Sequence, residues 1–117
     1  MAFRVTNQTQ GKILADRVVE ARSFLHRFLG LMGRAELPFG EGLHIVPCRS
    51  IHTFFMRVPI DAIFLDDSGR VVKTYPALPP WRLSGMYLRA HSVLELPSGT
   101  VAGSGTMEGD RLSFEPV

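Results

Sequence analysis

The sequence has little of what would place a protein outside the cytoplasm or divide it into several parts. One cysteine in 117 residues excludes an internal disulfide framework. The first residues turn polar at once and lack the apolar core of a signal peptide. No apolar run approaches the length of a transmembrane helix. We therefore expect one soluble domain, residues 1–117, located in the cytoplasm.

Charge of one sign is not concentrated along the chain either. Lys and Arg number 13 against 11 Asp and Glu, which gives a net charge of +2 and a pI near 9.1. The basic residues are scattered and form no run of the kind that marks a nucleic-acid or membrane surface. The composition predicts no nucleic-acid partner, no membrane partner and a weak preference for anionic ligands. It leaves the oligomeric state open.

Short segments rich in β-branched and aromatic residues make up most of the chain. Asn7–Gly11 and Asp67–Gly69 predict two hairpin connections. Pro47 interrupts a strand or places it at a sheet edge. The predicted strands are residues 3–6, 12–16, 43–46, 51–57, 60–66, 70–75, 91–96 and 111–114.

One segment has the apolar period of an amphipathic helix. Its apolar stripe consists of Ala21, Phe24, Leu25, Phe28, Leu29 and Met32. Ser23 is suited to cap its start and Gly33 to end it, while His26 falls on the solvated face. The glycine-rich residues 97–105 have room for one further helical turn. We predict a mainly β fold of the α+β class, a compact curled sheet or small barrel of seven to eight short strands with the amphipathic helix packed on it.

The stretch from Cys48 to Asp66 places polar side chains among apolar ones, where polar groups are costly to bury. The candidate binding residues are Arg49, His52, Arg57 and Asp61 from this stretch, together with Trp81. Trp81 lies in a Pro-Pro-Trp loop, where it is suited either to stack on a sugar or other flat ligand or to cap the core.

Asp61 and Glu95 are carboxylates inside apolar strand segments. A buried carboxylate must be paired, hydrogen-bonded or protonated. For Asp61 the pattern favours a structural role at the Val58–Pro59 bend through backbone N–H groups, with a functional carboxylate as the alternative. For Glu95 it favours pairing with an arginine. If the two met across the sheet, their pKa values would separate, as an acid–base pair requires.

A spacing of four residues separates His44, Cys48 and His52, and this spacing suggests a metal site. In one straight strand successive side chains would lie roughly 13 Å apart, so a turn at Pro47 would be needed to gather them. We predict no metal and no cofactor. Cys48 with His52 is also a candidate nucleophile and base, although a lone cysteine is more often a small buried hydrophobe. His52 is expected to hydrogen-bond a backbone group or Asp61.

Five motifs resemble those of a known prokaryotic family. They are Gly30–Met32, Pro47–Met56, Ile60–Asp66 followed by Gly69, Leu94–Pro97 followed by Gly99, and Gly109–Asp110. On these motifs the chain is similar to the uncharacterised "domain of unknown function 192" family. The resemblance covers most of the chain and implies a small, mainly β domain with a flanking helix and no established reaction.

One segment departs from the family pattern. Many members of the family carry a Trp-Met-Lys-Asn-like run where this chain has Phe55-Met56-Arg57-Val58. The positive charge is retained at Arg57, and the amide is replaced by Val58.

The sequence contains no complete catalytic constellation. We predict a non-catalytic module that binds a small or anionic ligand or a protein partner through Arg49, His52, Arg57 and Trp81, with Asp61 orienting the arginines. The alternative is a small hydrolase or transferase that uses Cys48/His52 or Asp61/Glu95. A third interpretation is that these polar residues only fix the fold.

Overall fold

A single sheet makes up most of the described chain. The structure, a computed structural model, describes residues 1–23 and 31–117. The strand order in the seven-stranded sheet is β5-β4-β6-β3-β2-β1-β7. The β2–β3 pairing is parallel and the other pairings are antiparallel. The elements are β1 (Ala2–Asn7), β2 (Lys12–Ala21), β3 (Glu41–Ile45), β4 (Ile60–Leu65), β5 (Val71–Leu78), β6 (Ser92–Pro97), the short helix α2 (Thr100–Ser104) and β7 (Leu112–Pro116).

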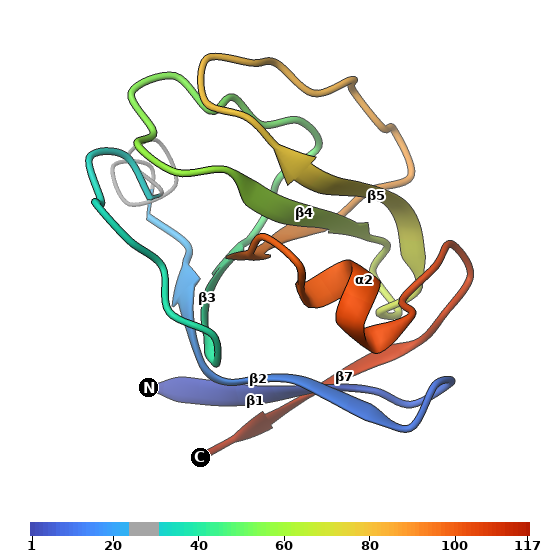
Figure 1. Ribbon diagram of the computed structural model, residues 1–117. Helices are drawn as coiled ribbons and strands as arrows, with labels where there is room; N and C mark the ends of the chain where they lie inside the picture. Colours follow the sequence, from blue (N-terminus) through green and yellow to red (C-terminus); the bar gives the residue numbers. More distant parts are fainter. Residues whose placement is uncertain (24–30) are drawn as a thin grey trace.

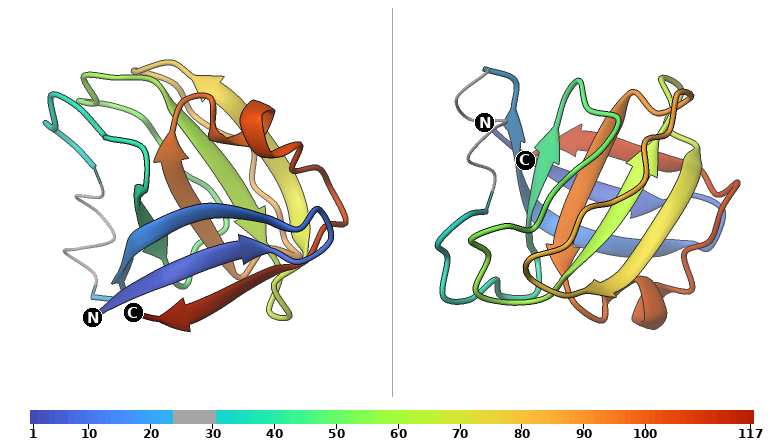
Figure 2. Two further views of the ribbon diagram at one scale, coloured as in Figure 1. Left: turned by 60° about the horizontal axis from the view of Figure 1, so that its bottom comes forward. Right: turned by 90° about the horizontal axis from the view of Figure 1, so that it is seen from above.

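The sheet curls into a half-barrel and has a hydrophobic core on each face. In Figure 1, β1, β2 and β7 lie across from β4 and β5, with α2 between them, and Figure 2 shows the curl from two further sides. Side chains alternate along a strand, so β4 sends Ile63 and Leu65 to the inner core and Ile60 and Ala62 to the outer core. Val101 of α2 fills the inner core. The predicted mainly β class with a curled sheet is confirmed.

The two edge strands, β5 and β7, meet at one end of the half-barrel. The Val71 N–H donates to the Asp110 carbonyl at 2.8 Å, and the Leu112 N–H donates to the Gly69 carbonyl at 2.8 Å. Gly69 has φ +84°, and a Cβ there would lie 2.6 Å from the Leu112 carbonyl oxygen. Glycine is therefore required at the tip of this hairpin, where the sequence predicts a turn.

Two long connections cover the outer face of the sheet, and we call residues 47–59 and 79–91 together the loop layer. They lie side by side near the top of Figure 1. Ile51 and Met56 point inward and are buried in the outer core. The connections are joined by backbone hydrogen bonds from Cys48 to His91, from Tyr87 to Arg49 and from Ser84 to Ile51, at 2.9 to 3.0 Å.

The predicted strand at residues 51–57 is wrong. His52 makes only an isolated antiparallel bridge to Leu83. The backbone of Phe55 then takes φ 66°, in the left-handed region that interrupts an extended strand. The β-forming residues of this segment pair with the other connection of the loop layer and not with the sheet.

The predicted amphipathic helix falls mostly on residues 24–30, which lie outside the described residues. Ala21, at the start of its apolar stripe, is the last residue of β2. The helical turn predicted within residues 97–105 is confirmed as α2. In the two described ranges, no helix combines the length and the apolar character that crossing a membrane requires.

Candidate functional site

Thr53 joins the two halves of the loop layer and is fully buried. Its N–H donates to the Arg82 carbonyl at 2.8 Å, and its carbonyl accepts from the Trp81 N–H at 2.9 Å. Its hydroxyl donates to the Pro79 carbonyl at 2.6 Å and accepts from the Arg82 N–H at 2.8 Å. These contacts satisfy the backbone on both sides of Trp81, so the residue is held in place by its main chain.

An exposed aromatic pair lies directly beside this junction. The rings of Phe55 and Trp81 have centroids 4.8 Å apart at an interplanar angle of 59°, and the side chains are 59% and 57% exposed. Both residues have positive φ values, 66° and 64°. Left-handed backbone is unfavourable for bulky residues and, where it occurs, is often found at functional sites. The fold thus presents two large rings to solvent in a conformation that costs free energy.

His52 extends the aromatic surface on the same connection. Its ring centroid lies 5.2 Å from that of Phe54, whose ring stacks 5.9 Å from Trp81. The His52 Nδ1 accepts a hydrogen bond from the Phe54 N–H at 3.1 Å. The neutral ring therefore carries its proton on Nε2. This backbone hydrogen bond is one of the two partners that the sequence leads us to expect for His52.

The two segments of the loop layer carry basic residues and no acids of their own. Its sequence contains Arg49, Arg57, Arg82 and Arg89 and no Asp or Glu, and all four arginines are exposed. The rest of the chain holds nine Lys and Arg residues against all eleven Asp and Glu residues. The arginines come from two segments that backbone hydrogen bonds join, and Arg89 lines a depression together with Asp66, Arg70 and Glu108 of neighbouring elements.

Asp61 lies in the centre of the sheet and does not orient the arginines as predicted. It is fully buried in β4, between β5 and β6. Its Oδ1 accepts the N–H of Ala77 at 2.8 Å, and its Oδ2 accepts the N–H of Val101 at 2.7 Å. This geometry supports the structural role predicted for Asp61. The carboxylate, however, accepts backbone N–H groups of β5 and α2 and not of the Val58–Pro59 bend.

Asp61 and Glu95 do not form an acid–base pair. In the β4–β6 register, Asp61 lies opposite Leu96 of the inner core, whereas Glu95 lies opposite Ala62 of the outer core. The two carboxyl groups therefore point to opposite faces of the sheet. Burial raises the pKa of Glu95 to about 8, so this side chain is mostly a neutral acid at pH 7.

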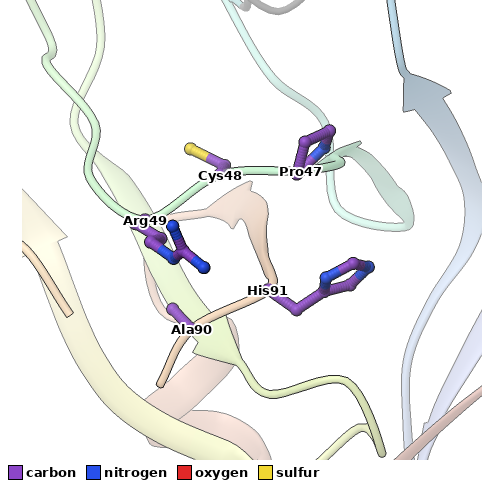
Figure 3. Close-up of a pocket in the computed structure, with 5 residues that line it drawn as sticks. All are labelled: Pro47, Cys48, Arg49, Ala90 and His91. Carbon is purple, nitrogen blue, oxygen red and sulfur yellow. The ribbon is translucent and has the colours of Figure 1, made fainter. Parts of the chain in front are cut away.

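Cys48 lies at an open depression of about 480 Å³ lined by Pro47, Cys48, Arg49, Ala90 and His91. The thiol donates to the Ser50 carbonyl at 3.0 Å, and in Figure 3 the sulfur points away from His91. In the neutral His52 ring, the nitrogen that carries the lone pair, Nδ1, already accepts the Phe54 N–H. A Cys48/His52 nucleophile and base would require His52 to release the Phe54 N–H.

His44 lies apart from Cys48 and His52, on the inner side of β3. It stacks on Phe114 with ring centroids 4.3 Å apart, and its Nδ1 is 3.9 Å from a carboxylate oxygen of Glu20. Neither ring nitrogen has a hydrogen-bond partner among the described residues. Burial lowers the pKa of His44 to about 4. Within residues 1–23 and 31–117, no three His, Cys, Asp or Glu side chains gather as ligands for a metal ion.

Comparison with known proteins places this fold and sequence in a family. The model of the family DUF192, described as "Uncharacterized ACR", matches residues 5–114. The chain belongs to the DUF192 family. A UPF0127 protein of Thermococcus kodakarensis is 35% identical over 118 residues, which cover 97% of this chain and 74% of the relative.

Two crystal structures share the DUF192 fold seen here. A Novosphingobium aromaticivorans protein of unknown function is 25% identical with a TM-score of 0.82, covering 95% of this chain and 82% of its own. A Sinorhizobium meliloti protein described as a candidate transcription regulator is 24% identical with a TM-score of 0.80, covering 96% and 91%. This second likeness shows the fold alone. The family is uncharacterised, and none of these descriptions assigns a reaction.

Two residues of this DUF192 domain contribute to the loop layer in ways that the sequence does not predict. Thr53 has the pattern of an ordinary strand residue, and its role depends on a partner segment 26 to 29 residues away. Phe55 has the pattern of a core residue of a strand, although the structure exposes it beside Trp81. The family resemblance implies one signal for Phe55, because many members carry a Trp-Met-Lys-Asn-like run whose tryptophan falls at this position.

Proposed function

We propose that this protein is a non-catalytic binding module that recognises a small anionic ligand with a flat ring, or a partner protein that presents such a group, through the loop layer. The observation that carries the proposal is the exposed Phe55–Trp81 pair in a layer whose two segments hold four exposed arginines and no acid of their own. Arg49, His52 and Arg57 accompany the pair. Asp61 contributes through the scaffold and makes no direct contact with the ligand, because it is fully buried.

The chemistry of these side chains suits such a ligand. An aromatic face attracts flat rings by stacking, and each good aromatic contact contributes about 0.5–1.5 kcal/mol beyond its buried area. Guanidinium groups bind carboxylate or phosphate through directed, charge-assisted hydrogen bonds. Because Thr53 fixes the backbone on both sides of Trp81, little conformational entropy is lost when a ligand binds.

Binding without catalysis is proposed because neither catalytic pair raised by the sequence has a workable geometry. Asp61 and Glu95 face opposite sides of the sheet, and His52 would have to release the Phe54 N–H before it could accept a proton from Cys48. We also propose that the ligand is not a nucleic acid, because the net charge of the chain is only +2 and its sequence has no basic run.

The test uses Trp81, which is the only tryptophan and gives a single indole N–H signal in ¹H–¹⁵N NMR spectra. Titration with 1-naphthyl phosphate is expected to shift this signal saturably, while neutral 1-naphthol and inorganic phosphate bind more weakly. Phe55→Ala and Arg57→Ala should each weaken binding by about fivefold, equivalent to about 1 kcal/mol.

The matched controls are Ile13→Ala and Arg4→Ala, which remove an exposed apolar and an exposed basic side chain from β2 and β1. Both variants should bind like the parent protein. The proposal is wrong if the Trp81 signal does not respond to the naphthyl phosphate, or if it responds equally in the Phe55→Ala variant.

A further inference from the structure

The exposed apolar surface of the loop layer extends well beyond the aromatic pair. Leu83, Met86 and Leu88 are 69%, 69% and 77% exposed, on the same connection as Trp81. Tyr87 packs inward against the outer core, so its neighbours Met86 and Leu88 are directed to solvent. Five of the eleven large apolar side chains exposed in the described residues thus belong to the loop layer. Such a concentration marks an interaction surface.

The aliphatic part of this surface narrows the class of partner. A flat ring needs only the aromatic pair, and stacked bases would likewise leave the three aliphatic side chains in water. Aliphatic side chains beside Trp and Phe are typical of surfaces that enter the boundary between lipid headgroups and acyl chains. Arg49, Arg57 and Arg82 are exposed on segments that hold no Asp or Glu, and they complement an anionic surface, whereas Arg89 lies beside Asp66 and Glu108.

We infer that the loop layer docks this protein on an anionic lipid bilayer, with Leu83, Met86, Leu88 and Trp81 entering the interface and the arginines contacting lipid phosphates. The inference rests on the proposed function in one respect, namely that the loop layer is a binding surface. It departs from the expectation of no membrane partner, which rested on the absence of a basic run in the sequence.

The shape of the molecule allows this approach. Both chain termini lie at the opposite end of the half-barrel from the loop layer, which Figure 1 shows at the top with N and C below. A flat surface can therefore meet the two connections without contacting the chain ends. The ladder of backbone hydrogen bonds and the Thr53 junction hold the apolar side chains at fixed positions, as a docking surface requires.

The test is co-sedimentation with phosphatidylcholine vesicles, with and without 50% phosphatidylglycerol, at 0.15 M and 0.5 M NaCl. We expect binding to the anionic vesicles with a blue shift of Trp81 emission, quenching of that emission by brominated acyl chains, and weaker binding at high salt. The variant Leu83→Ser/Met86→Ser/Leu88→Ser should lose the blue shift. Arg57→Ala/Arg82→Ala should lower the partition coefficient by about fivefold for each arginine.

The controls are Ile13→Ser and Arg4→Ala, which should bind vesicles like the parent protein, and thermal unfolding should show that every variant is folded. The inference is overturned if anionic vesicles bind no better than neutral ones, or if the loop-layer variants bind unchanged. It is also overturned if concentration-dependent self-association, lost in the triple Ser variant, shows that a second copy covers this surface.

The inference and the proposed function fail in different ways. A Trp81 response to naphthyl phosphate without vesicle binding would keep the proposed function and overturn the bilayer inference. Vesicle binding without a response to naphthyl phosphate would support the bilayer inference and exclude the small-ligand form of the proposed function. If neither response is observed, both the bilayer inference and the proposed function are wrong.

Discussion

Asp61 shows how a single buried charge can be used entirely for architecture. Its two oxygens accept backbone N–H groups from Ala77 of β5 and Val101 of α2, two segments that are distant in sequence. A carboxylate can accept both bonds at once, which no other small side chain can do without introducing a donor. The residue thereby fixes α2 against the inner side of the sheet, and Ala77 in its left-handed conformation, φ 52°.

Asp61→Asn is expected to destabilise the fold by about 2 kcal/mol or more, since the amide NH₂ would face one of the two backbone donors in a buried site. Urea unfolding followed by circular dichroism measures the loss. Asp67→Asn, an exposed position in the β4–β5 turn, is the matched control and should stay within about 0.5 kcal/mol of the parent. An Asp61→Asn variant as stable as the parent would show that Asp61 is retained for another reason.

The alternation rule predicts that Asp61 faces the opposite way from Ala62, but it does not predict which residue of β6 lies beside each. The observed register puts Asp61 opposite Leu96 and Glu95 opposite Ala62. A slip of one residue would have placed the two carboxyl groups together. Register depends on long-range packing, so the sequence could name both carboxylates without deciding whether they meet.

At the scale of elements, the mainly apolar segments between turn residues are the most predictable feature of this chain. β4 and β6 are buried on both faces, and such segments predict both of them although each contains one carboxylate. Residues 51–57 have the same β-forming composition and still do not form a sheet strand. Composition indicates that this segment is extended, whereas its partner and the left-handed φ of Phe55 are set by the loop layer.

The β3–β6 contact depends on the absence of a side chain at Gly42. A Cβ on Gly42 would lie 2.9 Å from the Glu95 carbonyl oxygen and 2.8 Å from a methyl carbon of Leu96. Gly42→Ala should therefore force the strands apart and cost about 1–3 kcal/mol. Thermal unfolding measures the effect, and a Gly42→Ala protein as stable as the parent would show that β3 shifts without strain.

Gly103→Ala is the matched control for that substitution. Gly103 lies in α2, and a Cβ there would meet nothing within 4 Å. Since alanine is a better helix former than glycine, this variant should be as stable as the parent or more stable by up to about 1 kcal/mol. The opposite signs of the two changes separate the close approach of strands from a general effect of adding a methyl group.

At the scale of the whole molecule, Glu95 and His44 are buried on opposite faces of the sheet and change the stability of the fold with pH in opposite directions. Burial raises the pKa of Glu95 from 4.5 to about 8, so its contribution to stability is complete below pH 4.5 and is lost as the pH rises to 8. Burial lowers the pKa of His44 from 6.5 to about 4, so its contribution is complete above pH 6.5 and is lost as the pH falls to 4.

These two effects predict the shape of the stability curve. Between pH 4.5 and 6.5 the folded protein holds one proton more at Glu95 and one fewer at His44 than the unfolded chain, so the two slopes cancel. Above pH 6.5 Glu95 acts alone, and the free energy of unfolding should fall by up to about 1.4 kcal/mol per pH unit until pH 8. The hydrogen bonds that lower the pKa of Asp66 and of Asp110 add a further loss only below pH 3.8.

Single variants should reveal how each group alone changes the free energy of unfolding with pH. Urea unfolding at pH steps from 4 to 8 measures this dependence. In Glu95→Gln only His44 remains, and stability should rise with pH up to 6.5 and then stay level. In His44→Phe, which preserves stacking on Phe114, only Glu95 remains, and stability should fall steadily from pH 4.5 to 8. The double variant should be level across the whole range. If the parent protein already shows a steep slope between pH 4.5 and 6.5, at least one of the two groups does not titrate as its burial requires.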